Sequence, residues 1–201
     1  MLKPYADSVN KKMNDVVAVA EIPLETGQPE GALGNLLADI MLNEARIMYK
    51  TTVDVAFINP GGIRLSSISM GNITRGKIFE LAPFDNIIVL LKLTGKQLQE
   101  FLDLTAARGG WPVAGLTMQI KNRQAISVRI KNISLDSNAM YIVALPDYVA
   151  NGGDNATMLR GVPQQNNGNI FREAVIKYLS EMNKLGIKIS SKIENRVSNA
   201  K

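Results

Sequence analysis

The stretch VDVAFINPGGIR, residues 53–64, organises the interpretation of the whole chain. Its first half, residues 53–58, is mostly apolar and β-branched, which predicts a buried strand. The next four residues, Asn-Pro-Gly-Gly at 59–62, end that strand, because proline lacks a backbone donor and glycine permits unusual backbone angles. Arg64 then supplies a planar cation with five donors. Such a stretch either presents an anion or a sugar to a rigid loop, or is an ordinary tight turn with a solvated arginine.

The length of 201 residues suits one larger domain or two small ones, and we expect a single domain over residues 1–201. Hydrophobic residues make up 46% of the chain, enough for a substantial core. The net charge is +5, but the basic residues are scattered, and Lys11-Lys12 is the only adjacent pair. Nucleic-acid binding needs a basic stripe or patch, so no nucleic acid is expected as a partner.

The chain contains no cysteine and no histidine, and these two absences exclude several chemistries. Disulfides, thiolate nucleophiles, His-ligated metals and His-based triads are all ruled out. The carboxylates are dispersed, and neither a Walker loop nor a nucleophile elbow is present. We therefore expect no catalytic residue, no metal site and no cofactor in this chain.

No membrane segment is expected from the hydropathy pattern. No apolar run approaches the roughly 20 residues that a transmembrane helix needs. Met1-Leu2-Lys3 is followed by no apolar segment, so the sequence shows no signal peptide.

Helical and strand periodicities predict an α+β fold, a mixed and mostly antiparallel sheet with helices packed on it. Residues 115–145 are expected to form an antiparallel block of three strands, and the tail 187–201 an edge strand or a frayed end. Thr74, Thr94 and Asn169 are the expected helix caps. The expected helices are 1–15 (chiefly 3–14), 35–49, 74–81, 95–108 and 170–184; the strands are 16–22, 53–58, 87–93, 115–120, 125–130 and 139–145; the polar loops are 26–31, 65–72, 146–155 and 164–169.

Three loops combine special backbone with useful side chains, and each adjoins an apolar strand, so they could meet at one rim of the sheet. They are residues 59–64, 83–86 and 147–154. Together they hold two aromatics, a carboxylate and an arginine, which suit a flat base, ribose hydroxyls and an anionic group. Taken singly, each has a plainer explanation: core packing for the phenylalanine, strand-end packing for the tyrosine, and an Asx turn for the aspartate.

Four motifs in this order resemble the C-terminal domain of the 5'-nucleotidase / UDP-sugar hydrolase family. They are Leu-Gly-Asn-Leu-Leu-Ala-Asp at 33–39, Asn-Pro-Gly-Gly-Ile-Arg at 59–64, Pro-Phe at 83–84 and Tyr-Val-Ala-Asn-Gly-Gly-Asp at 148–154. The likeness runs from about Val16 to the last helix. Each motif alone is weak, whereas four in order over most of the chain are specific.

The resemblance implies a division of labour between two domains. In that family an N-terminal metallophosphoesterase domain carries two metal ions, and the C-terminal domain binds the nucleotide and brings it to the metals by rotation. This chain resembles the C-terminal domain alone. The implied partners are a nucleotide or nucleoside and a metallophosphoesterase domain or subunit, with divalent metals only in the latter. Periplasmic or cell-surface localisation is also implied.

The resemblance assigns roles residue by residue. Phe84 and Tyr148 would flank the base, Asp154 would bind the ribose hydroxyls, and Asn59 and Arg64 would lie towards the phosphate. The glycines of both turns would shape the loops. The implied substrate-binding residues are Asn59, Gly61, Gly62, Arg64, Phe84, Tyr148, Asn151, Gly152, Gly153 and Asp154.

Three positions depart from the family pattern. Tyr148 stands where the family often has phenylalanine, and Pro60 where other members vary. The family usually has an arginine shortly before the Leu-Gly-Asn motif, and this chain reads Gly-Gln-Pro-Glu at residues 27–30. Two functions stay open: substrate recognition for a 5'-nucleotidase, or a non-enzymatic nucleoside-binding or interaction module.

Overall fold

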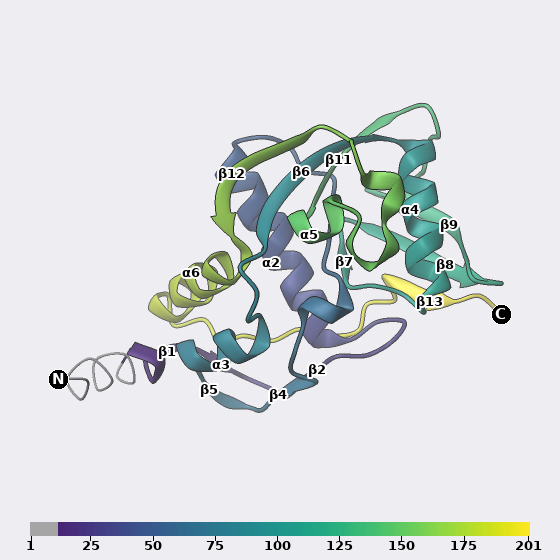
Figure 1. Cartoon of the computed structure of the whole chain (residues 1–201). Coiled ribbons are helices and arrows are strands. Elements are labelled where there is room, and N and C mark those ends of the chain that lie inside the picture. Colours follow the sequence, from purple (N-terminus) through teal and green to yellow (C-terminus); the bar gives the residue numbers. More distant parts are fainter. Residues whose placement is uncertain (1–11) are drawn as a thin grey trace.

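The computed structural model describes residues 12–201 and confirms an α+β fold (Figure 1). The helices are α2 (Ala32–Tyr49), α3 (Arg75–Leu81), α4 (Gly95–Ala107), α5 (Asp147–Ala150) and α6 (Phe171–Lys184), with 3-10 turns at Pro60–Gly62, Gly153–Asn155 and Thr157–Leu159. The strands are β1 (Val16–Ala20), β2 (Leu24–Glu25), β3 (Val55–Phe57), β4 (Ser67–Ile68), β5 (Gly71–Thr74), β6 (Ile87–Thr94), β7 (Val113–Ala114), β8 (Leu116–Lys121), β9 (Gln124–Ile130), β10 (Ile133–Ser134), β11 (Met140–Pro146), β12 (Gln164–Ile170) and β13 (Val197–Asn199). The expected N-terminal helix lies mostly outside the described residues. Among residues 12–201, no helix has the length and apolarity to cross a membrane.

The strands are divided between sheets, which corrects the expectation of one mixed sheet. A five-stranded sheet has the order β12-β6-β11-β3-β7, and a four-stranded sheet has the order β10-β9-β8-β13. β11 therefore does not continue the β8–β9 hairpin, and the expected three-strand block is wrong. β8 buries alternate residues, as in a sheet with one wet face, whereas the second half of β11 is buried throughout and suits the centre of a covered sheet.

The larger sheet lies between two hydrophobic clusters. Along β3 the side chains alternate: Val55 and Phe57 join one cluster, and Ala56 joins the other. The first cluster is covered by α4 and the smaller sheet, and the second by α2 and α6 (Figure 1). The apolar run at 87–93 is an inner strand, as expected.

Two of the three expected helix caps are confirmed. The Thr74 hydroxyl caps α3, and Thr94 forms a capping box with Gln97 on α4. Asn169 does not cap α6, because residues 164–170 pair with β6 as strand β12, and the capping residue is Ile170. β12 is an edge strand whose middle residues are exposed on both faces. Its sequence is therefore polar throughout and lacks the alternation of apolar and polar residues that would indicate a strand.

Two other expected loops also contain regular structure. Within 65–72, β4 pairs with β2, and β5 begins its pairing with β1. Within 146–155, the one-turn helix α5 is followed by a 3-10 turn. Short elements of two to four residues lack the periodicity by which a sequence indicates structure.

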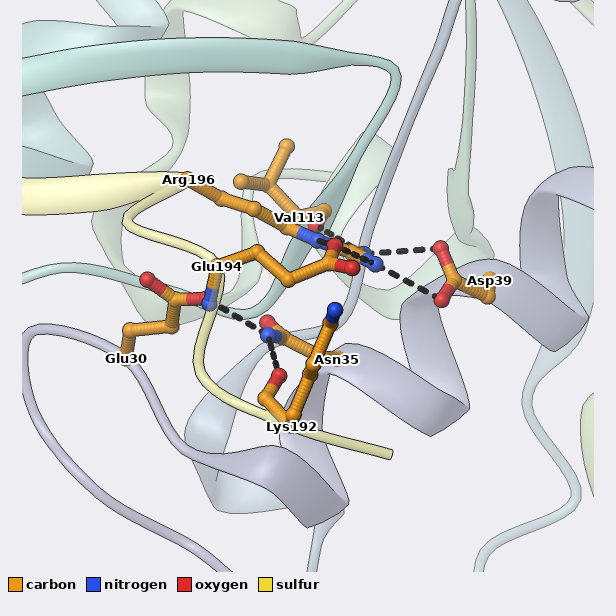
Figure 2. A network of polar contacts seen from close by, with 7 residues as sticks. All are labelled: Glu30, Asn35, Asp39, Val113, Lys192, Glu194 and Arg196. Atoms are coloured by element: carbon orange, nitrogen blue, oxygen red, sulfur yellow. Dashed lines mark hydrogen bonds and ion pairs between the residues drawn. The ribbon is translucent and has the colours of Figure 1, made fainter. Parts of the chain in front are cut away.

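The C-terminal tail is fastened to α2 by the 33–39 motif (Figure 2). Asn35 donates from Nδ2 to the Lys192 carbonyl at 2.9 Å, and Arg196 contacts both carboxylate oxygens of Asp39 at 2.7 and 2.8 Å. Arg196 also donates to the Val113 carbonyl and pairs with Glu194. Asn35 and Asp39 are four residues apart and share one face of the helix. They lead the tail to β8, where β13 pairs as a parallel edge strand. Of the two alternatives expected for the tail, an edge strand or a frayed end, residues 197–199 form the edge strand.

Replacing Arg196 by methionine should lower the free energy of unfolding by about 1 kcal/mol. Hydrogen bonds to charged groups contribute roughly 1.5–3 kcal/mol, and the half-exposed carboxylates of Asp39 and Glu194 reduce that value here. Urea unfolding followed by circular dichroism measures the change. Asp39→Asn is the matched control and should lose less, because the amide still accepts one of the two bonds. An unchanged midpoint in Arg196→Met would contradict the role of this network.

Candidate functional site

The three loops singled out in the sequence meet around one pocket of about 220 Å³. It is lined by Asn59, Gly61, Gly62, Phe84, Asn86, Tyr148 and Asp154. Six of these seven residues belong to the set implied by the resemblance. Asn86 is not in that set, although it belongs to the 83–86 loop. A lone asparagine beside a proline turn ordinarily has a local structural role, so its sequence gives no sign of a binding residue.

Sheet topology explains why the loops converge. β3 and β11 are parallel neighbours, so their carboxyl ends lie at the same end of the sheet, where the chain leaves both strands. β6 is antiparallel to β11, with Ile88 opposite Pro146, so the chain enters β6 at that same end. The turn after β3, the turn before β6 and the turn after β11 therefore form one rim.

Two aromatic side chains stand at the pocket with about half of their surface open to solvent. Phe84 is 47% exposed and Tyr148 is 48% exposed. Core packing, the plainer explanation for Phe84, does not account for this exposure. Half-exposed rings beside a pocket offer flat apolar faces to a flat ligand.

The Tyr148 ring lies against backbone that only glycine provides. A Cβ at residue 153 would come within 2.5 Å of the Tyr148 ring carbon Cε1, so Gly153 leaves the space that the ring occupies. Gly152 has a φ of 90°, in the region that favours glycine. The Tyr148 hydroxyl accepts a long hydrogen bond, 3.4 Å, from the backbone N–H of Asp154. The two glycines shape the site without lining the pocket.

Asp154 and Asn59 form the polar side of the pocket. Asn59 is 3% exposed, and its Nδ2 donates to Asp154 Oδ2 at 2.7 Å. Among the described residues no donor contacts the other oxygen of Asp154, which can accept hydrogen bonds from vicinal hydroxyls. Asn59 thus orients the carboxylate and lines this pocket, whereas Arg64 does not line it.

Arg64 lines a second pocket, of about 390 Å³, which also borders the Pro60–Gly62 turn. Pro60 contacts this pocket, while the two glycines that follow contact the first. Arg64 is exposed, and no carboxylate of the described residues pairs with it. Its guanidinium is therefore available to an anion.

Gln28 stands in the loop where the resemblance implies an arginine, and it lines the same pocket as Arg64. Its Nε2 donates to the Arg108 carbonyl at 2.9 Å and to the Gly110 carbonyl at 3.4 Å. The 26–30 loop therefore borders the pocket that holds Arg64. Asn151 lies elsewhere: its Oδ1 accepts from Gln164 Nε2 on β12, and it lines neither pocket.

A metal ion is held by several side chains that ligate it together. Within residues 12–201, no three Asp or Glu side chains converge as ligands of an ion would. The polar side chains that line the pocket are one carboxylate, two amides and the Tyr148 hydroxyl. These groups suit hydrogen bonding to a polar organic ligand.

Comparison with known proteins identifies the family. The family described as "5'-nucleotidase, C-terminal domain" matches residues 15–161. The crystal structure of a 5'-nucleotidase precursor from Thermus thermophilus superposes with a TM-score of 0.84 and 30% identity, covering 98% of this chain. This chain therefore belongs to the 5'-nucleotidase C-terminal domain family, and the recognition from its four motifs is confirmed.

The chain matches only a part of each of these larger proteins. It is 28% identical to the trifunctional nucleotide phosphoesterase protein YfkN of Bacillus subtilis, over 98% of this chain and 14% of that protein. It is 28% identical to a 5'-nucleotidase of Vibrio vulnificus, over 90% of this chain and 34% of that protein. Of the Thermus structure, the match covers 42%. These proportions are consistent with a separate phosphoesterase domain in the full-length relatives.

Proposed function

We propose that this chain is the substrate-recognition domain of a 5'-nucleotidase and binds a nucleotide through its nucleoside. The observation that carries the proposal is the pocket between the three loops. Two half-exposed aromatics stand beside one carboxylate, which a buried asparagine orients. A flat ring and a pair of hydroxyls are the complements of these groups.

In the proposed complex each group has one task. The base lies between Phe84 and Tyr148, and the ribose hydroxyls donate to Asp154. The phosphate extends across the Pro60–Gly62 turn towards Arg64, which faces the neighbouring pocket. A charge-assisted contact from a guanidinium then holds the phosphate oxygens.

The chemistry of hydrolysis is assigned to a metallophosphoesterase domain or subunit. That domain would supply divalent metals, whose chemistry would be to polarise the phosphoryl group and to activate water. This chain would bind and present the substrate. Periplasmic or cell-surface localisation is part of the proposal, on the basis of family membership.

We expect the isolated chain to release no phosphate from AMP or UMP, with or without Mg²⁺, Mn²⁺ or Zn²⁺. The reason is chemical: the sequence has no histidine and no cluster of carboxylates to hold a catalytic ion. A colorimetric phosphate assay on purified protein measures this, with the Asp154→Asn variant carried alongside. Metal-dependent release that depends on Asp154 would contradict the expectation, whereas release unaffected by that substitution would indicate a contaminant.

One experiment distinguishes the two open functions, substrate recognition for a 5'-nucleotidase and a non-enzymatic binding module. The chain is combined with a metallophosphoesterase domain encoded beside it, or with that of a full-length relative, and tested for co-purification and AMP hydrolysis. Hydrolysis that requires both parts supports the substrate-recognition role. Nucleoside binding without any gain in hydrolysis would favour the non-enzymatic module instead.

A further inference from the structure

The ring of Phe84 is held at the pocket mainly through its backbone. Nearly half of the side chain faces solvent, so apolar burial contributes less to its position than it does for a core residue. The segment 82–86 that carries it has no helix or strand assignment. Contacts to the backbone of this segment therefore decide where the ring stands.

Arg172, in the first turn of α6, makes most of these contacts. Its Nη1 lies 3.3, 3.0 and 3.4 Å from the carbonyl oxygens of Ala82, Pro83 and Phe84. Its Nη2 pairs with the carboxylate of Asp85. One guanidinium thus binds four consecutive residues around the ring.

The guanidinium is itself fixed in place. Arg172 is 7% exposed, and its guanidinium carbon lies 4.3 Å from the centre of the Phe79 ring, a cation–π contact. A backbone hydrogen bond also links α6 to the last residue of the 82–86 segment: the Phe171 N–H donates to the Asn86 carbonyl at 2.8 Å. The first turn of α6 therefore contacts both ends of the 82–86 segment: Arg172 contacts its start and Phe171 its last residue.

We propose that Arg172 is a positioning residue for nucleoside binding and acts through Phe84. It holds the 82–86 segment so that the ring lines the pocket together with Tyr148. A lysine at this position keeps the charge, but its single ammonium cannot reproduce the planar fork that spans the carbonyls and the carboxylate. The proposal rests on the proposed function, since it takes Phe84 to be a base-stacking residue.

The test is a double-mutant cycle between Arg172→Lys and Phe84→Ala, with adenosine affinity measured by calorimetry. With Phe84 present, Arg172→Lys should weaken binding about three- to tenfold, less than loss of the whole ring. In the Phe84→Ala background the same substitution should change affinity by less than about twofold. Arg196→Met is the matched control: it also removes a largely buried guanidinium, but Arg196 does not line the pocket, so the variant should leave affinity unchanged.

A second variant, Asp85→Asn, tests the same contact in case Arg172→Lys does not fold. Asp85 has a side chain that is 73% exposed, so Asp85→Asn removes one of the two carboxylates that pair with Arg172, the other being that of Glu173, with little risk to the fold. It should weaken adenosine binding by about two- to threefold, again only when Phe84 is present. Equal losses with and without Phe84, or unchanged affinity in both Arg172→Lys and Asp85→Asn, would overturn the proposal.

A spectroscopic measurement separates this proposal from the function on which it rests. The chain has 5 phenylalanines, so 4-fluorophenylalanine labelling gives a short ¹⁹F spectrum in which Phe84→Leu assigns one line. Arg172→Lys should shift or broaden the Phe84 line without any ligand; an unmoved line would overturn the positioning role. If Phe84→Ala leaves adenosine affinity unchanged while the line moves, Arg172 positions the ring, but the base is bound elsewhere and the proposed function fails.

Discussion

Replacing Phe84 or Tyr148 by alanine should weaken adenosine binding by about ten- to a hundredfold. Stacking of a base on an aromatic side chain is worth roughly 1–3 kcal/mol in nucleic-acid complexes, which corresponds to this range. Both rings are half exposed, so their removal should cost the fold little compared with truncation in the core. The loss should therefore appear in binding and not in stability.

Isothermal titration calorimetry with adenosine and with uridine measures both effects. Met140→Ala is a suitable control, because Met140 is exposed to the same extent, 47%, but does not line the pocket. It should bind as the unmodified chain does. Unchanged affinity in both Phe84→Ala and Tyr148→Ala, with native circular dichroism, would place the nucleoside site elsewhere.

The meeting of the three loops could be predicted from the sequence because their strands are strongly apolar. Residues 53–58, 87–93 and 139–145 carry enough hydrophobic side chains to belong to one buried sheet. Turns that adjoin such strands lie at the rims of the sheet. The choice of the same rim depends on β3 and β11 being parallel and β6 antiparallel, and strand direction has no signal in composition.

The division into separate sheets could not be predicted in this way. β9 and β11 follow each other closely in the chain, which favours pairing between them. In the structure the short strand β10 pairs with β9 in the place where β11 was expected, and β11 belongs to the larger sheet. That preference arises from burial on both faces of β11, which is a property of the assembled fold.

Arg172 illustrates what sequence patterns leave out of a site. It adjoins Phe171, the first residue of the apolar stripe of α6, and a single arginine there would ordinarily point to solvent. Its partners in the 82–86 segment lie 87 to 90 residues earlier in the chain. A guanidinium that serves a distant backbone segment has no local spacing by which it can be recognised.

Replacing Gln28 by arginine should raise the preference for AMP over adenosine by about tenfold or more. A charge-assisted hydrogen bond contributes roughly 1.5–3 kcal/mol net, and a bidentate guanidinium contact is of this kind. Gln28 and Arg64 line the same pocket, so a second guanidinium would stand on the side proposed for the phosphate. Without it, Arg64 is the only cation that the family motifs place there. The unmodified chain should therefore bind AMP only slightly more tightly than adenosine, if at all.

The affinity ratio of AMP to adenosine is the quantity to measure, because it cancels effects on base stacking. Gln28→Met is the matched control: it loses the bonds to the Arg108 and Gly110 carbonyls without adding charge, and should leave the ratio unchanged. Arg64→Met should bring the ratio to about one, since it removes the remaining guanidinium. In a two-domain enzyme the metals would carry most of the phosphate recognition, so the missing arginine is tolerable there. If the unmodified chain already prefers AMP a hundredfold, or if Gln28→Arg leaves the ratio unmoved, the 26–30 loop does not serve the phosphate.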